Sequence, residues 1–174
     1  MRSPPPNASP AKTQDGRYLV ATSSEAVYLR VVGLGTMRNC VAFKRFADEV
    51  RAGGCDKFVI DLAQCQGFDS TFMGVLLGLV FAKTTVVVIN VSPQHRELLR
   101  GVGLHRLLRL CDSTVETPEF HLKELEIAPA SAASRARVML SAHENLAKVD
   151  RRNEEKFGTF IRALREDLGG DAQG

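Results

Sequence analysis

A short acidic, hydroxyl-bearing stretch stands directly before an almost fully apolar run in the segment GFDSTFMGVLLGLV, residues 67–80. Asp69 and Ser70 are of the types that commonly cap a helix, because their side-chain oxygens accept backbone N–H groups that the first turn leaves unpaired. A serine hydroxyl in that place can also be phosphorylated, and the positive end of the helix dipole favours the added charge. The stretch therefore predicts a helix cap, a modification site at Ser70, or both.

A phosphate at this place would act through charge. It would add about −1.5 to −2 charges to Ser70, next to the carboxylate of Asp69. That local charge can repel an acidic partner surface or hinder apolar docking. We therefore expect a switch at Ser70 to change binding and to leave the conformation of the domain unaltered.

The remaining reactive side chains show no spacing typical of a catalytic or metal site. The cysteines form no CxxC pair, and the histidines form neither HxxxH nor HExxH. GxxxxGK[ST] and GxGxxG do not occur, so no phosphate-binding loop indicates a nucleotide enzyme. We expect reduced, mostly buried thiols, no metal, no cofactor and no catalytic residue, although spacing alone leaves a Cys/His nucleophile open. The residues concerned are Cys40, Cys55, Cys65, Cys111, His95, His105, His121 and His143.

Composition and charge narrow the classes of function. The chain has 174 residues, 44% of them hydrophobic, which suits one globular domain with appendages. A net charge of +3 and the absence of tryptophan give no support for nucleic-acid binding. The N-terminus has no apolar stretch, and the longest apolar run, residues 72–82, is about half the ~20 residues that span a bilayer. We expect a cytoplasmic protein without nucleic-acid binding or membrane insertion.

The segment HRELLRGVGLHRLLRL, residues 95–110, gathers four arginines. Such a segment could form a helix for a membrane surface or for nucleic acid. More often the arginines form a solvated face above a leucine core, and we expect that arrangement here.

Strand-like and helix-like segments alternate along the chain. Runs rich in β-branched and aromatic residues predict strands at 17–22, 26–32, 57–62, 84–91 and 106–110. Apolar spacing and capping signals predict helices around 43–52, 70–83, 92–101 and 117–127. Because alternating strands and helices build right-handed crossovers, and the first two strands suggest a hairpin, we expect an α/β fold with a mixed, mostly parallel sheet.

Glycines and one polar segment mark the expected breaks between these elements. Gly33 and Gly35 should end the second strand, and AQCQGF, residues 63–68, should form a loop. Gly74 and Gly78 should let the following helix pack closely on the sheet.

Both ends of the chain extend beyond this core. Residues 1–16 are rich in proline and serine and should form a disordered tail. Residues 129–174 are expected to be a linker and a helical extension, with apolar residues at helical spacing from Met139 onwards. The charged middle, DRRNEEK, leaves open whether this extension is one long helix or two shorter ones. Its apolar stripe packs on its own domain, pairs with a copy in a homodimer, or docks a dedicated partner.

The segment FVIDLAQCQGFDSTFMGVLLGLV resembles the signature of STAS domains, and specifically of bacterial anti-sigma factor antagonists. Members of that family have a strand that ends in Asp-Leu, then a loop, then an Asp-Ser-Ser-Gly-Leu-Gly turn that opens a helix. Asp61 and Leu62 match the strand end, while Asp69, Ser70 and Gly74 match the turn.

A second match lies downstream, in VVVINVSPQHRELLRGVGLHRLLRL, which is similar to the family's fourth strand, third helix and Gly-Leu turn, here Gly103-Leu104. The two matches cover residues 17–127 and agree with the order of elements predicted above. The resemblance implies a STAS-like fold for residues 17–128.

The resemblance also implies a non-enzymatic switch controlled by phosphorylation. Ser70 would be the phosphoacceptor, and the unmodified protein would bind an anti-sigma factor, which is often itself the serine kinase. A PP2C-type phosphatase would reset the cycle. The surface that meets the partner would include the loop before Asp69, residues 33–38, and the start of the following helix, namely Asp69, Ser70, Thr71, Phe72 and Gly74.

This sequence departs from the family turn at Phe72 and Met73, which stand where the family has glycine and leucine. The bulky Phe72 side chain is expected to alter the surface beside Ser70. A second hypothesis is a non-switching STAS scaffold or accessory subunit, as in stressosome or transporter-linked relatives. A receiver-type phosphotransfer domain needs an acidic cluster after its first strand, and RYLVAT, residues 17–22, supplies none.

Overall fold

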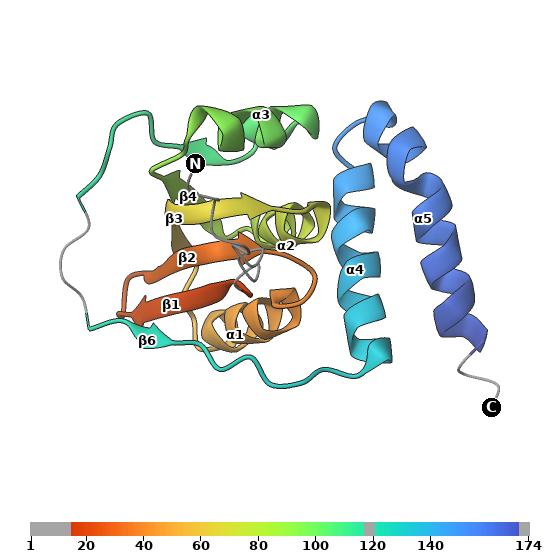
Figure 1. Ribbon diagram of the computed structural model, residues 1–174, viewed down its shortest axis with the longest axis horizontal. Coiled ribbons are helices and arrows are strands. Elements are labelled where there is room, and N and C mark those ends of the chain that lie inside the picture. Colours follow the sequence, from red (N-terminus) through yellow and green to blue (C-terminus); the bar gives the residue numbers. More distant parts are fainter. Residues whose placement is uncertain (1–14, 117–120, 171–174) are drawn as a thin grey trace, which may run out of the picture.

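The computed structural model describes residues 15–116 and 121–170, which form a six-stranded sheet with helices packed against it (Figure 1). The strands are β1 (Arg17–Thr22), β2 (Val27–Gly35), β3 (Lys57–Phe68), β4 (Thr85–Ile89), β5 (Arg109–Leu110) and β6 (Lys123–Glu124). Their order across the sheet is β5-β4-β3-β2-β1-β6. β1 pairs antiparallel with β2 and β6, whereas neighbours from β2 to β5 run parallel. The predicted mixed, mostly parallel sheet is confirmed.

The helices are α1 (Cys40–Ala52), α2 (Ser70–Phe81), α3 (Pro93–Gly101), α4 (Ala132–Ala147) and α5 (Arg151–Gly170). The predicted cap of α3 is present, because the Ser92 hydroxyl accepts the His95 N–H and a proline follows at the first helical position. α1 ends before Gly54, whose φ of 95° lies in the left-handed region that glycine adopts without strain.

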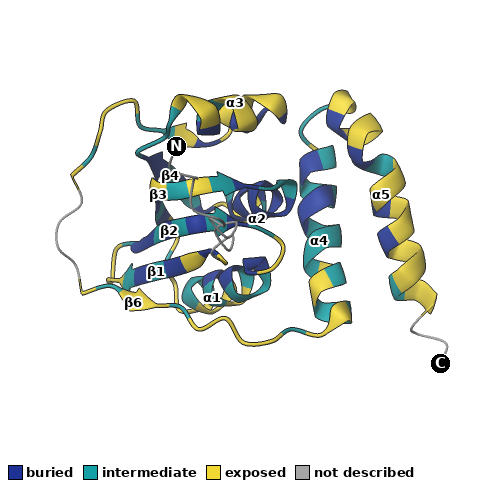
Figure 2. Ribbon diagram, viewed as in Figure 1, coloured by how far each residue is buried: buried dark blue, intermediate teal, exposed yellow. Residues whose placement is uncertain are grey.

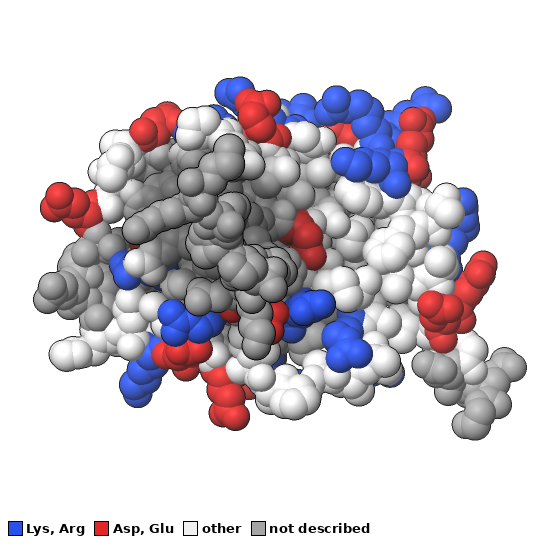
Figure 3. Space-filling view, viewed as in Figure 1, with Lys and Arg blue, Asp and Glu red and all other residues white. Residues whose placement is uncertain are grey.

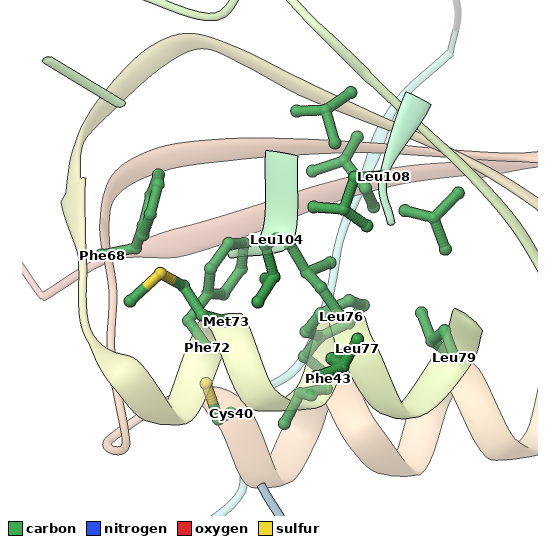
Figure 4. Close-up of a cluster of buried hydrophobic side chains, with 14 of the residues drawn as sticks. Cys40, Phe43, Phe68, Phe72, Met73, Leu76, Leu77, Leu79, Leu104 and Leu108 are labelled. Carbon is green, nitrogen blue, oxygen red and sulfur yellow. The ribbon is translucent and has the colours of Figure 1, made fainter. Parts of the chain in front are cut away.

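The hydrophobic core lies between the sheet and the helices α1 and α2. Alternate residues of the strands point into it, among them Leu29, Phe58 and Ile60, each 0% exposed. The side chains of α2 that join them appear in Figure 4, and the dark blue of α2 in Figure 2 shows how far that helix is buried. α2 is buried nearly all round because the sheet covers one of its sides and α4 another, which accounts for its almost uniformly apolar sequence.

The arginine-rich segment 95–110 has the predicted arrangement. Leu99, Leu104 and Leu108 are buried, whereas Arg100 and Arg106 are exposed. Figure 3 shows Lys and Arg side chains along the upper edge of the molecule, over α3 and the turn between α4 and α5. The arginines form a solvated face above a leucine core.

Two strands are longer than predicted. β2 does not end at Gly33, because this glycine takes a φ of 77° and the pairing with β3 shifts register there instead of stopping. β3 continues through residues 63–68, which were expected to form a loop and instead pair in parallel with the end of β2. Most side chains of this extension are exposed, so its backbone pairing with β2 holds it in the sheet. A strand of this kind has no hydrophobic pattern from which it could be predicted.

The helix predicted over residues 117–127 is wrong for the described part of that segment. Residues 121–127 contain β6 instead, and the Leu125 N–H donates to the Tyr18 carbonyl at 2.8 Å. β6 pairs with the outer side of β1, where an uncovered edge would leave backbone groups unpaired. The predicted cap at Thr117-Pro118 lies outside the described residues, as does the predicted disordered tail up to residue 14.

The C-terminal extension forms two helices joined by a short turn, and we call α4 together with α5 the C-terminal hairpin (Figure 1). Asp150 separates them, because its carboxylate accepts the Asn153 N–H at 3.0 Å and caps α5. The apolar stripe of α4 packs on its own domain, with Ala142 and Leu146 at 1% and 0% exposure. The structure therefore shows two shorter helices, folded back on the sheet domain.

The close packing predicted at the glycines of α2 is present, but its partner is α4 and not the sheet. A Cβ added at Gly74 would lie 2.2 Å from the carbonyl oxygen of Ala142, and one added at Gly78 would lie 2.8 Å from the side chain of Asn145. The two glycines therefore let the backbones of α2 and α4 approach closely.

Within the described residues, no helix has the length and apolar character needed to cross a membrane. The same residues bring no three His, Cys, Asp or Glu side chains together in a group that could hold a metal ion. All four cysteines are free thiols, but only Cys40 is fully buried. The expectation of mostly buried thiols is wrong for the other three, Cys55, Cys65 and Cys111, which are partly exposed.

Candidate functional site

The predicted helix cap is present at Asp69, directly before α2. One carboxylate oxygen accepts the Phe72 N–H at 3.0 Å, as an N-cap does. The other accepts the Met37 N–H at 2.9 Å, from the loop between β2 and α1, and the Asp69 N–H donates to the Gly35 carbonyl at 3.0 Å. Asp69 therefore fixes the loop between β2 and α1 against the start of α2.

Ser70 is the first residue of α2, and its side chain meets the C-terminal hairpin. The Ser70 hydroxyl lies 2.9 Å from Nε2 of His143 in α4. Nδ1 of the same ring lies 2.7 Å from the carbonyl oxygen of Met139, which can only accept, so Nδ1 carries the proton. In the neutral ring Nε2 is then an acceptor, and the Ser70 hydroxyl donates to it. Ser70 is thus half-buried and already hydrogen-bonded.

His143 is held in this position from its other side by α5. The residue is 3% exposed, and its ring lies edge-on to Phe157 and Phe160, with centroid distances of 5.2 and 4.8 Å. Burial lowers the pKa of the imidazole, and the hydrogen bond to Met139 and the charge of Asp69 offset this only in part. The ring therefore stays neutral at neutral pH and keeps its acceptor atom towards Ser70.

This arrangement occupies the Ser70 hydroxyl. Its proton is donated to the neutral His143 imidazole, which lies where a group attached to the Ser70 oxygen would have to fit. The N-terminal end of α2 favours the negative charge of a phosphorylated product, whereas the adjacent Asp69 carboxylate opposes it. A phosphate on Ser70 would place its negative charge beside Asp69, and it would change what can dock there.

The expectation that Phe72 alters the outer surface is wrong. Its side chain is 0% exposed and lies in the core, where its ring packs against Phe43 and Phe68 at centroid distances of 5.9 and 5.4 Å (Figure 4). Gly35 leaves the space for this ring, because a Cβ added there would lie 2.9 Å from it. The residue that departs most from the family turn therefore contributes to packing.

Thr71 and Gly74 were also expected at the partner-binding surface, and the structure places both inside. Thr71 is 2% exposed, and Gly74 lies under Ala142 of α4. Of the five predicted residues, only Asp69 and Ser70 keep part of their surface in contact with solvent.

The exposed residues beside them come from the loop between β2 and α1, which falls within the predicted segment 33–38. Met37 is 38% exposed, and Arg38 is exposed and forms an ion pair with Asp15 at 3.4 Å. We call Met37, Arg38, Asp69 and Ser70 the switch surface. Asp69 holds this surface together through its bond to the Met37 N–H.

Asp61, the other acidic residue of the signature, lies inside the sheet and not on the switch surface. It is 0% exposed and accepts hydrogen bonds from Asn90 at 2.8 Å, from the Ala63 N–H at 2.9 Å, from Arg30 Nε at 3.1 Å and from the Tyr28 hydroxyl. Burial by itself would raise the pKa of this carboxyl, but the four hydrogen bonds outweigh it and lower the pKa. Asp61 therefore joins β2, β3 and the end of β4, and its role is structural.

Two residues of the site were not predicted from the sequence. In the sequence His143 is one of four scattered histidines, and no motif marks Asn145. In the structure the side chain of Asn145 donates to the Gly74 carbonyl at 3.2 Å. The signal that could have found them is the apolar stripe of the extension, since both residues lie within one turn of Ala142 and Leu146. What the stripe does not tell is which helix it packs against.

Over more than half of its length, the chain is similar to solved structures of anti-sigma factor antagonists. One, from Mycobacterium paratuberculosis, has 21% identity over 57% of this chain and 87% of its own, with a TM-score of 0.50. SpoIIAA in its unphosphorylated form has 19% identity over 55% of this chain and 87% of its own, with a TM-score of 0.42. The Bacillus SpoIIAA in its phosphorylated form has 20% identity over 55% and 90%, with a TM-score of 0.41. At these identities the likeness concerns the fold.

No curated protein matches the chain significantly. A family model described as "Mlab, STAS domain" matches residues 19–110, which is more than half of the 174 residues and runs from β1 to β5. The matched segment contains the Asp61-Leu62 pair within β3, the capped Ser70 turn and the Gly103-Leu104 turn, and it stops before the C-terminal hairpin. With this match, the six-stranded sheet and the cap at Asp69 in place, the chain belongs to the STAS-domain family.

Proposed function

We propose that this protein is a phosphorylation-controlled interaction module of the anti-sigma factor antagonist type. In its unmodified form it binds an anti-sigma factor that is also a serine kinase, and phosphorylation of Ser70 ends that binding. A PP2C-type phosphatase restores the unmodified form. The protein itself is not an enzyme, and it acts in the cytoplasm by exchanging partners.

The observation that carries the proposal is the placement of Ser70. It is the first residue of a helix whose cap, Asp69, also fixes the exposed loop of Met37 and Arg38. A phosphate on Ser70 would bring about two negative charges to the centre of the switch surface. An acidic or apolar partner surface that fits the unmodified site would then be repelled, without a change in the fold of the sheet domain.

Phosphorylation by the cognate kinase tests the proposal directly. The protein is incubated with ATP and each serine-kinase anti-sigma factor encoded in the same genome, and the phosphate is located by mass spectrometry. We expect one phosphate, on Ser70, which Ser70→Ala abolishes. Thr71→Ala is the matched control, because the side chain of Thr71 is 2% exposed and should not be an acceptor. A phosphate on Thr71 or at another position contradicts the assignment.

Binding gives a second, independent readout. Ser70→Asp should weaken capture of the kinase in a pull-down, and Ser70→Ala should not, because only the first places a negative charge on the switch surface. Equal capture by both variants would mean that charge at position 70 does not control the interaction.

One observation favours a non-switching STAS scaffold or accessory subunit as a second candidate. The Ser70 hydroxyl is already bound to His143 under the C-terminal hairpin, as a purely structural serine would be. For such a protein, Ser70→Asp would leave its physiological complexes unchanged. Co-purification with membrane permeases, or a phosphate-free assembly of many copies, would identify this second function.

A further inference from the structure

The C-terminal hairpin covers the part of α2 that the proposed switch would use. We infer that this hairpin is an intramolecular lid: while α4 is seated on α2, Ser70 is closed to a kinase and the start of α2 is closed to a partner protein. The inference rests on the proposed function, since it concerns the regulation of the same site. The lid lies outside the segment that the STAS family model matches, because that match ends at residue 110 and α4 begins at Ala132.

The seat of α4 on α2 is a close contact between two backbones. The Ala142 carbonyl oxygen lies where a side chain at Gly74 would begin, and the Asn145 side chain donates to the Gly74 carbonyl at 3.2 Å. A protein partner cannot lie on this side of α2 while α4 occupies it. Partner binding here and closure of the hairpin therefore exclude each other.

Phosphorylation of Ser70 and closure of the hairpin exclude each other as well. The Ser70 oxygen has His143 Nε2 at 2.9 Å, and a phosphoryl group attached to that oxygen needs the same space. The imidazole cannot move away from Ser70 while the hairpin is closed, because Phe157 and Phe160 of α5 pack against its other side. A kinase must find the hairpin open, and a phosphate once attached prevents it from closing.

A pocket borders the seat on the side of α1. Its volume is 230 Å³, it lies between α1, α2 and α4, and polar side chains such as Asp48, Arg51 and Asn145 line part of it. The turn of the hairpin is held more firmly, because buried Asn153 donates to the carbonyls of Val102 and Leu146 at 3.0 and 2.9 Å. In Figure 2 the first turns of α4 are less buried than its last turns. We expect α4 to lift from its beginning while the turn stays attached.

The lid lowers the apparent affinity for a kinase or partner, because either of them binds only the open state. A stronger contact between α4 and α2 therefore weakens the binding of both, and a weaker contact strengthens it. The hairpin thus adds a second level of control to the phosphorylation switch.

Cysteine labelling at position 70 measures opening without any kinase. Ser70→Cys is prepared in the full chain, alone and combined with Ala142→Arg, which places a charged side chain into the seat of α4. Reaction with a bulky maleimide is followed at each cysteine by mass spectrometry. We expect Ala142→Arg to speed labelling at position 70 by roughly tenfold or more, because the rate follows the population of the open form. Combination with Gly158→Ala is the matched control, since nothing lies near a Cβ at Gly158, and it should leave the rate unchanged.

Cys40 distinguishes opening of the lid from unfolding. It is 0% exposed in the core, so it stays unlabelled when only the hairpin moves. If Ala142→Arg exposes Cys40, the experiment is repeated with Gly74→Ala in place of Ala142→Arg. The Cβ added at Gly74 disturbs the same contact from α2, because it meets the Ala142 carbonyl. The variant used, Ala142→Arg or Gly74→Ala, must keep Cys40 unlabelled. If that variant labels position 70 no faster than Ser70→Cys alone, the lid is refuted.

The kinase assay then separates this inference from the proposed function. With Ser70 intact, Ala142→Arg should raise the initial rate of phosphorylation several-fold, and Gly158→Ala should not. Faster labelling at position 70 with no phosphorylation in any variant would refute the switch and leave the lid. Phosphorylation at the same rate in both variants, together with unchanged labelling, would refute the lid and leave the switch.

Discussion

Among single residues, Asp61 shows why a residue of the family signature need not lie at the working surface. Its carboxylate takes four hydrogen bonds from β2, β3 and the end of β4, and none of its surface is exposed. Asp61→Ala should lower the free energy of unfolding by about 3 kcal/mol, because it leaves Arg30 and Asn90 without their shared acceptor. Asp48→Ala, at a 52% exposed ion pair with Lys44, should cost no more than about 0.5 kcal/mol. Urea unfolding of both variants measures the difference, and similar losses would mean that the Asp61 network contributes little.

The buried imidazoles give the protein a pH-dependent stability. Burial lowers the pKa of His143 and of His95 below the ordinary value of 6.5. As the pH falls, these two histidines therefore take up protons at a higher pH in the unfolded chain than in the folded chain. The free energy of unfolding should therefore fall as the pH drops from about 7.5 to 5.5. His143→Gln should lose part of this dependence, while His105→Gln, at an exposed position, should keep all of it. Urea unfolding at the two pH values provides the measurement, and the same pH slope in all three proteins would contradict this account.

Among the secondary-structure elements, the contact between α2 and α4 depends on a position without a side chain. Gly74→Ala should lower the free energy of unfolding by about 2 kcal/mol, because a rigid backbone carbonyl of α4 stands 2.2 Å from the new Cβ. The same change at Gly158, on open helix surface, should raise stability by about 0.5–1 kcal/mol, since alanine is the better helix former. Thermal unfolding of the two variants should thus give shifts of opposite sign. Shifts of the same sign would show that α4 is not packed against Gly74 in solution.

How far the sequence predicts the elements depends on what holds each of them. The cap at Ser92-Pro93 and the β-branched run 84–91 carry local signals, and both were predicted, although β4 covers only Thr85–Ile89 of that run. The extension of β3 and the short β6 are held by backbone pairing to distant strands, which has no local signature. The cap at Asp69 was predicted for the same local reason as Ser92, whereas the contact of Ser70 with His143 spans 73 positions and required the packing of α4 to be known.

At the scale of the whole molecule, the hairpin turns a small sheet domain into a larger folding unit. Leu146, Phe157 and Ile161 join the same buried cluster as Phe58 and Leu76 of the sheet and α2. The extension therefore buries its apolar surface within the chain and leaves α5 with a mostly charged outer face, such as the exposed pair Arg151 and Glu155. A lid of this kind opens by giving up part of a shared core, so its closed state should dominate until a partner or a phosphate intervenes.

The same packing decides what oligomer to expect. A homodimer through the C-terminal helix was one of the readings of its apolar stripe, and that stripe is already used inside the chain, with Ala142, Leu146 and Leu164 buried. We expect a monomer of 19.0 kDa by size-exclusion chromatography with light scattering. Twice that mass in the unaltered protein would mean that the hairpin is exchanged between copies. In that case the Ala142→Arg variant should run at the mass of a monomer, because its α4 can no longer seat on α2 of another copy.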